Sequence, residues 1–224
     1  MYTETLFHGS NRLRGKQIIE NQIMEPSRGD NHWLGDGSYF FTEDFHSYKW
    51  IVDMYKNRHS HTLNYENLTK FYLILKGNIK VKKSRIFDLT KTEHKILFDR
   101  VYKEIKDKRQ LGDDFAEGIV INYMFNELPD YKEEFDVVKA VFILNKHKYE
   151  HVKTRIGFMP QEQLCIKNLE VVENIVEYDF KERTETFDLL LTDYYFEIHN
   201  TQKKPYNKRR SYDYNYKYKK KRSS

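Results

Sequence analysis

The alternation of apolar and polar residues along the chain predicts a mixture of strands and helices. Apolar residues three and four apart indicate helices, whereas short runs rich in β-branched and aromatic residues indicate strands. Strands are expected at residues 6–7, 38–41, 70–81, 136–144, 162–167 and 170–179. Helices are expected at residues 12–22, 43–57, 90–109 and 114–127. Residues 184–198 fit a helix and a strand equally well.

Turn and capping residues refine three of these boundaries. The motif His8-Gly9-Ser10 predicts a turn at the end of the first strand, because glycine favours turns. Gly77 makes residues 70–81 either a strand pair or one bent strand. Thr90 and Glu93 have the spacing of a capping box, in which each side chain bonds the backbone N–H of the other, and this predicts the start of the 90–109 helix.

The order of these elements predicts an α+β fold. Strands come early and late with helices between them, which differs from the regular strand–helix alternation of a parallel sheet. A length of 224 residues accommodates one domain or at most two. We expect one folded domain over residues 1–200, followed by a disordered, basic, tyrosine-rich tail over residues 201–224.

Charge is divided unevenly between these two parts. The chain carries a net charge of +5, and its tail holds ten Lys and Arg against one Asp. The tail is therefore at +9 and the body at −4. Cations contact phosphates and tyrosines stack on exposed bases, so we expect residues 203–222 to contact nucleic acid. The alternative is a solvated tail that aids solubility.

The cysteine count and the hydropathy pattern indicate the cellular compartment in which the protein is expected. The single cysteine, Cys165, excludes an intramolecular disulfide and a thiolate metal site, and it favours a reducing compartment. The first ten residues lack the basic and apolar segments of a signal peptide, and no apolar run is long enough to cross a bilayer. The histidines have no metal-ligand spacing. We therefore expect a cytoplasmic protein with no membrane contact and no metal.

Three segments contain residues that suit ligand chemistry. Residues 7–10 (FHGS) put an imidazole beside a backbone that a ligand can approach closely. Residues 33–41 combine a glycine turn with aromatic rings that can stack on a flat ligand. Residues 161–163 (QEQ) precede an apolar strand, where a carboxylate or carboxamide can bind a sugar hydroxyl and stabilise an oxocarbenium-like ring. Each segment taken alone also fits an ordinary turn or polar loop.

Together, the order and spacing of these segments resemble the ADP-ribosyltransferase superfamily. The resemblance is to the branch with a His–Tyr–acid triad, which includes poly-ADP-ribose polymerases and diphtheria-like toxins. In that branch an HG[ST] strand end comes first, a G-x-Tyr-Phe strand follows a loop, and a Glu or its substitute opens a late strand. Residues 8–10, 37–40 and 161–163 have this order, and the resemblance extends to about residue 180. It implies a split β-sandwich of two small antiparallel sheets with flanking helices, which binds NAD in the cleft between the sheets.

The resemblance also implies roles for individual residues. His8 would bond a ribose hydroxyl of NAD, Gly9 would hold the nicotinamide carboxamide through its backbone, and Ser10 belongs to the same NAD-binding motif. Tyr39 would stack on the nicotinamide ring. Two residues of the following helix fall where the family has a carboxamide-binding serine and a second stacking aromatic, namely Ser47 and Trp50. Core packing accounts for the tryptophan equally well.

The sequence departs from the family pattern at the acid. An acid followed directly by three apolar strand residues aligns with Gln163, whereas Glu162 lies one position earlier. Strand side chains alternate between faces, so both residues cannot face the nicotinamide ribose, and a bulge would be needed to select Glu162. Gln163 can bond a ribose hydroxyl but lacks the charge that stabilises an oxocarbenium ion. Both residues stay candidates, and elongation of ADP-ribose chains is not expected.

These features predict an NAD-dependent mono-ADP-ribosyltransferase, with NAD as substrate and with RNA, DNA or protein as acceptor. Small members of such families often act as toxins or in phage defence, which implies an antitoxin or inhibitor protein as a further partner. Two alternatives stay open. One is a nucleic-acid-binding protein on the same scaffold without transfer activity, and the other is an NAD glycohydrolase with water as acceptor. Cys165 is expected to be a buried strand residue.

Overall fold

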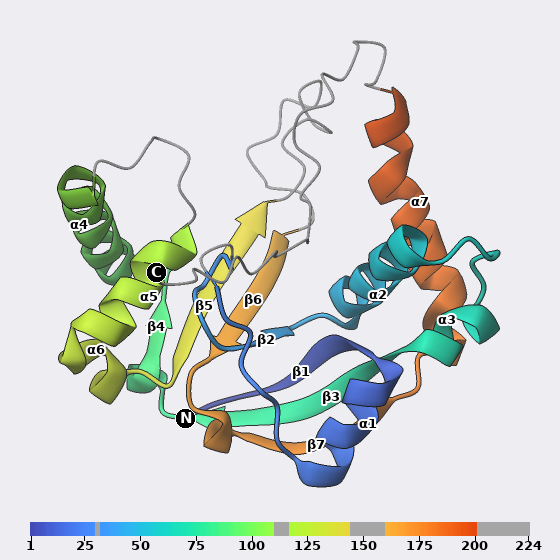
Figure 1. Ribbon diagram of the computed structural model, residues 1–224, viewed down its shortest axis with the longest axis horizontal. Coiled ribbons are helices and arrows are strands. Elements are labelled where there is room, and N and C mark those ends of the chain that lie inside the picture. The colour runs from blue at the N-terminus through green and yellow to red at the C-terminus, as the bar shows by residue number, and fades with distance from the viewer. Residues whose placement is uncertain (30–31, 110–116, 144–159, 201–224) are drawn as a thin grey trace, which may run out of the picture.

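The computed structural model of the protein describes residues 1–29, 32–109, 117–143 and 160–200 (Figure 1). Its strands are β1 (Tyr2–Asn11), β2 (Ser38–Phe41), β3 (Tyr72–Val81), β4 (Ile86–Asp88), β5 (Val137–Ile143), β6 (Pro160–Ile166) and β7 (Val172–Tyr178). Its helices are α1 (Arg12–Asn21), α2 (Asp44–Arg58), α3 (Tyr65–Phe71), α4 (Thr92–Arg109), α5 (Glu117–Glu127), α6 (Pro129–Glu134) and α7 (Thr184–Asn200). The predicted α+β class is confirmed. The predicted tail, residues 201–224, lies outside the described residues.

The strands of the described residues form one seven-stranded sheet in the order β4-β5-β6-β2-β1-β3-β7. β1 pairs with β3 along its whole length, from Tyr2 with Val81 to Asn11 with Tyr72. Neighbouring strands are antiparallel except β4 and β5, which are parallel. The parallel pair follows from the connection between them, because α4, α5 and α6 carry the chain back to the end of the sheet at which β4 began.

The join between β1 and β2 is the narrowest point of this sheet. Within the described residues, these two strands are paired at Phe7 and Phe41 alone. Figure 1 shows β1, β3 and β7 running in a different direction from β5 and β6. The prediction of two separate antiparallel sheets was therefore wrong in two respects. The two parts, β7-β3-β1 and β2-β6-β5-β4, are hydrogen-bonded into one sheet, and that sheet contains a parallel pair.

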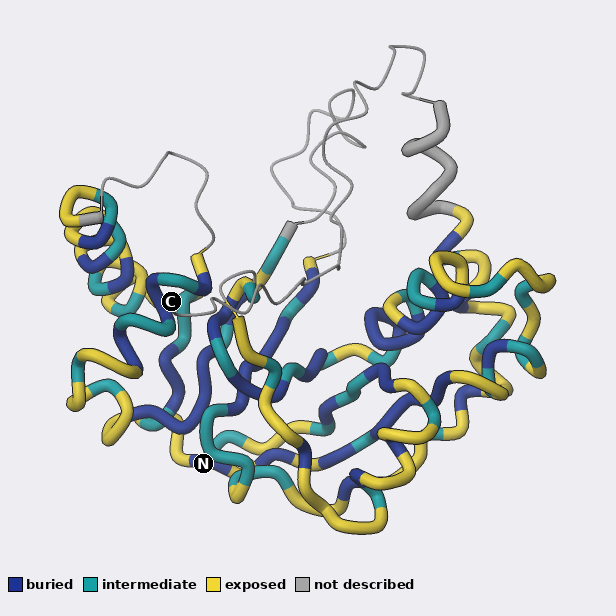
Figure 2. Tube along the Cα trace, in the orientation of Figure 1, coloured by how far each residue is buried: buried dark blue, intermediate teal, exposed yellow. Residues whose placement is uncertain are grey.

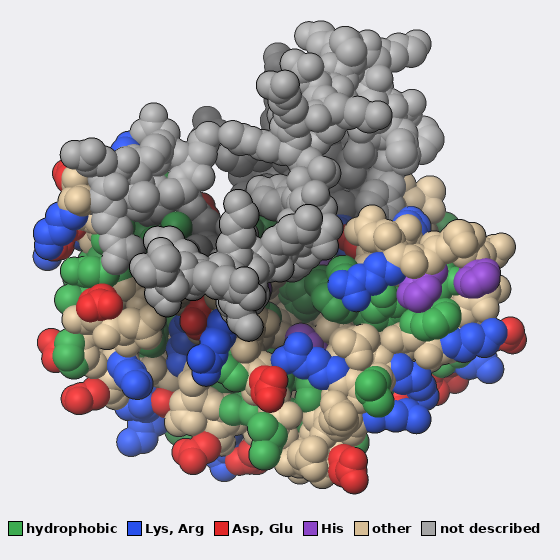
Figure 3. Space-filling model, in the orientation of Figure 1, with side chains coloured by type: hydrophobic (Ala, Val, Ile, Leu, Met, Phe, Trp, Pro, Cys, Tyr) green, Lys and Arg blue, Asp and Glu red, His purple; other side chains and the backbone are tan. Residues whose placement is uncertain are grey.

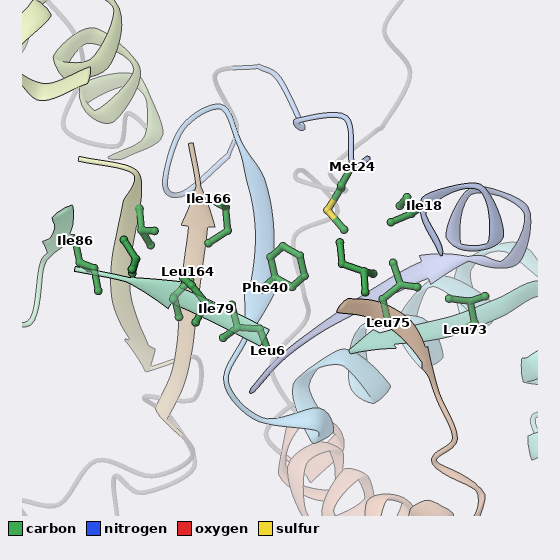
Figure 4. Close-up of a cluster of buried hydrophobic side chains, with 13 residues drawn as sticks. Leu6, Ile18, Met24, Phe40, Leu73, Leu75, Ile79, Ile86, Leu164 and Ile166 are labelled. Atoms are coloured by element: carbon green, nitrogen blue, oxygen red, sulfur yellow. The ribbon is translucent and has the colours of Figure 1, made fainter. Parts of the chain in front are cut away.

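Three clusters of buried side chains fill the space between the sheet and its helices (Figure 2). The first gathers Leu6, Phe40 and Leu164 from three neighbouring strands, with α1 beside them (Figure 4). The second lies between β5 and the helices α4 and α5. The third joins α2, α3 and α7 to β3. The first cluster lies at the narrow join, so the packing of Phe40 holds the two parts together there.

The structure corrects the local predictions in the first half of the chain. β1 continues through His8-Gly9-Ser10 to Asn11, so this motif lies inside a strand and the predicted turn was wrong. The reason is that β3 supplies partners for the whole of β1. Residues 72–81 form one strand, and the bend expected at Gly77 is a shift in its register with β7 between Lys76 and Asn78.

Two predictions of helix position also change. The predicted capping box was wrong, because α4 begins at Thr92 and the Thr90 hydroxyl instead donates to Asp88 Oδ1 at 2.6 Å. The ambiguous segment 184–198 lies within helix α7, because its Phe187 and Leu191 pack at helical spacing against α2.

The surface carries both signs of charge. On the face seen in Figure 3, Lys and Arg side chains alternate with Asp and Glu side chains over much of the described surface. No helix in the described part of the chain combines the length and the apolar composition that a membrane span requires.

Candidate functional site

The predicted motifs meet where β1 and β2 separate, a place that we call the split. Backbone groups along a strand point alternately to its two neighbours. The N–H of Thr42, at the end of β2, donates to β6 at 3.4 Å, so Phe41 and Tyr39 direct their backbone groups toward β1. Since Phe7 pairs with Phe41, the backbone of Gly9, two residues further, faces the split. This is the edge of β1 that β2 leaves uncovered in the described residues.

His8 bridges the split. Its Nδ1 lies 2.7 Å from the carbonyl oxygen of Tyr39. A carbonyl only accepts hydrogen bonds, so Nδ1 carries the proton and Nε2 is the acceptor nitrogen. Burial lowers the pKa of His8 to about 4, against the opposing effect of the bond to Tyr39, and the charge of Arg14 lowers it further. The imidazole is therefore neutral at pH 7, with an Nε2 lone pair that suits a hydroxyl donor.

Gly9 allows α2 to pack directly on β1. A Cβ at this position would lie 2.8 Å from Trp50 Cε3 and 3.0 Å from the carbonyl oxygen of Ser47. The structure thus brings together three residues that the sequence assigned to one site. Ser47 is buried, whereas Trp50 is 38% exposed and covers Gly9 with one edge of its ring. The predicted packing role of the tryptophan is therefore real, and its outer part is free to contact a ligand.

Two neighbouring residues of α2 bury polar atoms that lack a hydrogen-bond partner among the described residues. These atoms are Oγ of Ser47 and Nδ1 of His46. An unsatisfied buried polar atom costs about 1–3 kcal/mol, so two in succession on one helix indicate a functional role. Sequence reasoning missed His46. The signal that could have identified it is its position as a polar residue between Phe45 and Tyr48, two residues of the apolar stripe of α2.

Tyr39 holds the loop that precedes β2. Its hydroxyl accepts from the Leu34 N–H at 3.0 Å and donates to the Gly35 carbonyl at 2.5 Å. Burial is the main cause that raises the pKa of Tyr39, so the phenol stays protonated. Lys167 holds the same loop by donating to the Leu34 carbonyl at 2.9 Å. The ring of Tyr39 also has a neighbour in His32, whose ring centroid is 5.6 Å away.

The register of β2 and β6 places Gln163, and not Glu162, on the face of Tyr39. Directly opposite residues share a face, and Phe41 is opposite Gln163 while Tyr39 is opposite Cys165. Gln163 therefore lies on the face of Tyr39, with no bulge in this ladder. Glu162 lies on the other face, where its carboxylate pairs with Lys139 at 2.9 Å. Gln163 is 7% exposed, and Cys165 is fully buried, as predicted.

The sheet also separates some of the predicted site residues. His8 and Ser10 project to the face of Phe40, whose ring centroid is 5.7 Å from that of His8. Tyr39 and Gln163 project to the opposite face, where α2 covers Gly9. The His8 imidazole thus contacts the backbone carbonyl of Tyr39 and not the Tyr39 ring. Gly9, Tyr39, Ser47, Trp50 and Gln163 thus lie on one face of the sheet, with Gly9 against Ser47 and Trp50. The imidazole of His8 lies on the other face and bonds the Tyr39 carbonyl across the split.

Comparison with known proteins finds a relative that aligns with most of this chain. A protein of Methanocaldococcus jannaschii is 42% identical over 212 residues, which cover 86% of this chain and 95% of the relative. The chain belongs to the family of this archaeal protein. The relative bears the name uncharacterized protein MJ0359, which states no activity. No family model and no solved structure matches the chain.

Family membership therefore establishes a shared fold, and it assigns no activity. Since the alignment covers nearly the whole archaeal relative, that relative is expected to have both parts of the sheet and the split between them.

Proposed function

We propose that this chain is an NAD-dependent mono-ADP-ribosyltransferase. The observation that carries the proposal is the bond from His8 Nδ1 to the Tyr39 carbonyl across the split. This bond holds a neutral imidazole between β1 and β2, the two strands that carry the first two motifs of the resemblance. The narrow join at Phe7 and Phe41 supports the proposal as well, because the sheet changes direction there and leaves the backbone of Gly9 facing the split.

In this proposal the residues around the split divide the work of holding NAD. Nε2 of His8 accepts a hydrogen bond from a ribose hydroxyl, and the free backbone edge of Gly9 bonds the nicotinamide carboxamide. The buried hydroxyl of Ser47 gains the partner that it lacks among the described residues. The exposed part of Trp50 and the ring of Tyr39 flank the nicotinamide. Catalysis then rests on orientation of the glycosidic bond and on polar stabilisation of the oxocarbenium ion.

Gln163 is the third residue of the proposed triad. Its side chain shares a face with Tyr39, whereas Glu162 is on the opposite face and paired with Lys139. An amide can bond the ribose hydroxyl, but it offers no negative charge to the developing cation. We therefore propose transfer of a single ADP-ribose unit to a macromolecule, RNA, DNA or protein, and no chain elongation. A role as toxin or phage-defence effector, with an inhibitor protein as partner, is part of the same proposal.

The neighbouring pair Gln163 and Glu162 provides the test. Gln163→Met keeps the side-chain volume and removes the amide, so nicotinamide release from NAD is expected to fall by about 100-fold. Glu162→Gln is the matched control, because its side chain lies on the other face, and it is expected to stay within about twofold of the wild type. Release is measured by chromatography on full-length proteins with equal melting temperatures. Equal loss in both variants, or loss in Glu162→Gln alone, contradicts the assignment.

The uncharged amide of Gln163 favours one second candidate, a nucleic-acid-binding protein on the same scaffold without transfer activity. Incubation of the wild type with labelled NAD and RNA, DNA or lysate separates the possibilities. Label on a polymer supports the transferase, and nicotinamide release without labelled polymer indicates a glycohydrolase. Tight RNA binding with neither product supports the second candidate.

A further inference from the structure

His46 is a buried polar residue of α2 that has no role in the proposed NAD site. It is 5% exposed, and its Nδ1 has no hydrogen-bond partner in the described part of the chain. The next residue, Ser47, buries an unpartnered hydroxyl in the same turn of α2. Two such atoms in consecutive residues mark this turn as a place where polar ligand atoms belong.

The protonation of His46 follows from its one hydrogen bond. That bond joins the imidazole to the backbone of Pro160, the first residue of β6. Proline has no N–H, so its carbonyl accepts and the imidazole donates. Because Nδ1 is the nitrogen without a partner, Nε2 carries the proton and Nδ1 keeps the lone pair. His46 therefore presents a basic nitrogen.

The charge state of this imidazole agrees with its geometry. Burial lowers the pKa of His46 to about 4, opposed by the bond to Pro160. Of the nearby charges, Lys49 lowers this pKa further and Asp44 raises it. The ring is therefore neutral at pH 7, with the lone pair of Nδ1 unprotonated.

His46 packs against the β2 residue that is paired with Gln163, the uncharged member of the proposed triad. Its ring centroid is 5.8 Å from that of Phe41, and Phe41 lies directly opposite Gln163 in the ladder of β2 and β6. The ring of His46 thus packs on the face of the sheet that also carries Tyr39 and Gln163.

We propose that His46 is the general base that removes a proton from the acceptor, and that the acceptor is therefore an uncharged, protonated nucleophile such as a hydroxyl or an amide N–H. This inference rests on the proposed function. A carboxylate acceptor already has a free lone pair and loses no proton on attack, so its reaction requires no general base. The chemical class of the acceptor thus follows from the assignment of His46 as the base.

The reaction balances with the groups at hand. The bond between C1′ of the ribose and the nicotinamide nitrogen breaks, and nicotinamide leaves as a neutral molecule with the bonding electron pair. The acceptor oxygen or nitrogen forms its bond to C1′ while its proton passes to Nδ1 of His46. The resulting imidazolium then loses this proton to water. No oxidant, reductant or metal enters the step.

The first experiment compares two variants of this residue with a histidine elsewhere. His46→Gln can still donate to Pro160 but provides no base, so transfer of label from NAD to a polymer is expected to fall by about 100-fold or more. Its Kd for NAD is expected to stay within about twofold. Added imidazole is expected to restore part of the transfer in His46→Ala. His59→Gln, in which the lost ring stacks on Phe71, is the control and keeps wild-type transfer.

The second experiment reads the linkage on the labelled polymer from the wild type. Neutral hydroxylamine cleaves esters formed by carboxylates and leaves bonds to hydroxyl or amide acceptors intact, so the label is expected to survive the treatment. Release of the label by hydroxylamine, or undiminished transfer by His46→Gln, overturns this inference while the transferase stands. A wild type that neither binds nor cleaves NAD overturns the proposed function and this inference with it.

Discussion

His8→Ala is expected to reduce nicotinamide release from NAD by at least about 100-fold. The substitution removes the acceptor nitrogen at the split and also the 2.7 Å bond that holds the Tyr39 carbonyl. Both losses leave the glycosidic bond of NAD without the orientation on which the reaction depends. The rate is measured at saturating NAD, so that loss of affinity and loss of turnover are separated.

The control for this prediction is His61→Ala, which removes an exposed imidazole outside the site. It is expected to have the wild-type rate. The melting temperature of each variant shows whether the fold survives, because His8 is partly buried in the middle of β1. A folded His8→Ala protein that releases nicotinamide at the wild-type rate rules out the role assigned to the imidazole.

Gly118→Ala is expected to destabilise the protein by about 3 kcal/mol or more. A Cβ built on Gly118, in the first turn of α5, overlaps the carbonyl oxygen of His32. That atom belongs to the backbone of the loop that Tyr39 holds through Leu34 and Gly35, so the clash has no flexible side chain to absorb it. The free energy of unfolding is measured by denaturant titration.

Gly77→Ala is the matched comparison for this effect. Its Cβ would lie 3.1 Å from Val172 Cγ1, the end of a side chain on the neighbouring strand. A side-chain tip can move by a few tenths of an ångström, so the change in unfolding free energy is expected to stay within about 1 kcal/mol. Equal destabilisation in the two variants would contradict the packing of the loop on α5.

Periodicity was sufficient to find most elements of this fold. The stripe of Phe45, Tyr48, Val52 and Tyr55 gave helix α2, and all four residues are buried. Short apolar runs gave β2, β5, β6 and β7 to within a few residues. Periodicity could not show that β1 extends through the HGS motif, because a strand that includes Gly9 depends on the long-range ladder with β3.

The sequence grouped residues that the structure partly brings together, but it did not give their geometry. Sequence order brought His8, Gly9, Ser47 and Trp50 into one hypothesis, and the structure shows the last three in contact. Which face each side chain occupies depends on the register of three strands, which no local pattern encodes. The same limit applied to Gln163 and Glu162, whose faces follow from the pairing of β6 with β2.

His46 shows a different limit. A histidine inside an apolar stripe has no motif, and its importance became visible only when one ring nitrogen was found buried without a partner. Burial and hydrogen bonding are properties of the folded chain, so sequence alone gives them weakly.

The claim that NAD binds at the split is tested most directly by NMR on the full chain. The backbone amide of Gly9 faces the split, so its ¹H–¹⁵N resonance is expected to shift on addition of NAD, together with that of Ser47. The amide of Gly77, which packs against β7, is expected to stay unchanged. Saturable shifts confined to Gly9 and its neighbours support the account. Shifts at Gly77 with none at Gly9, or no shifts at millimolar NAD, contradict it.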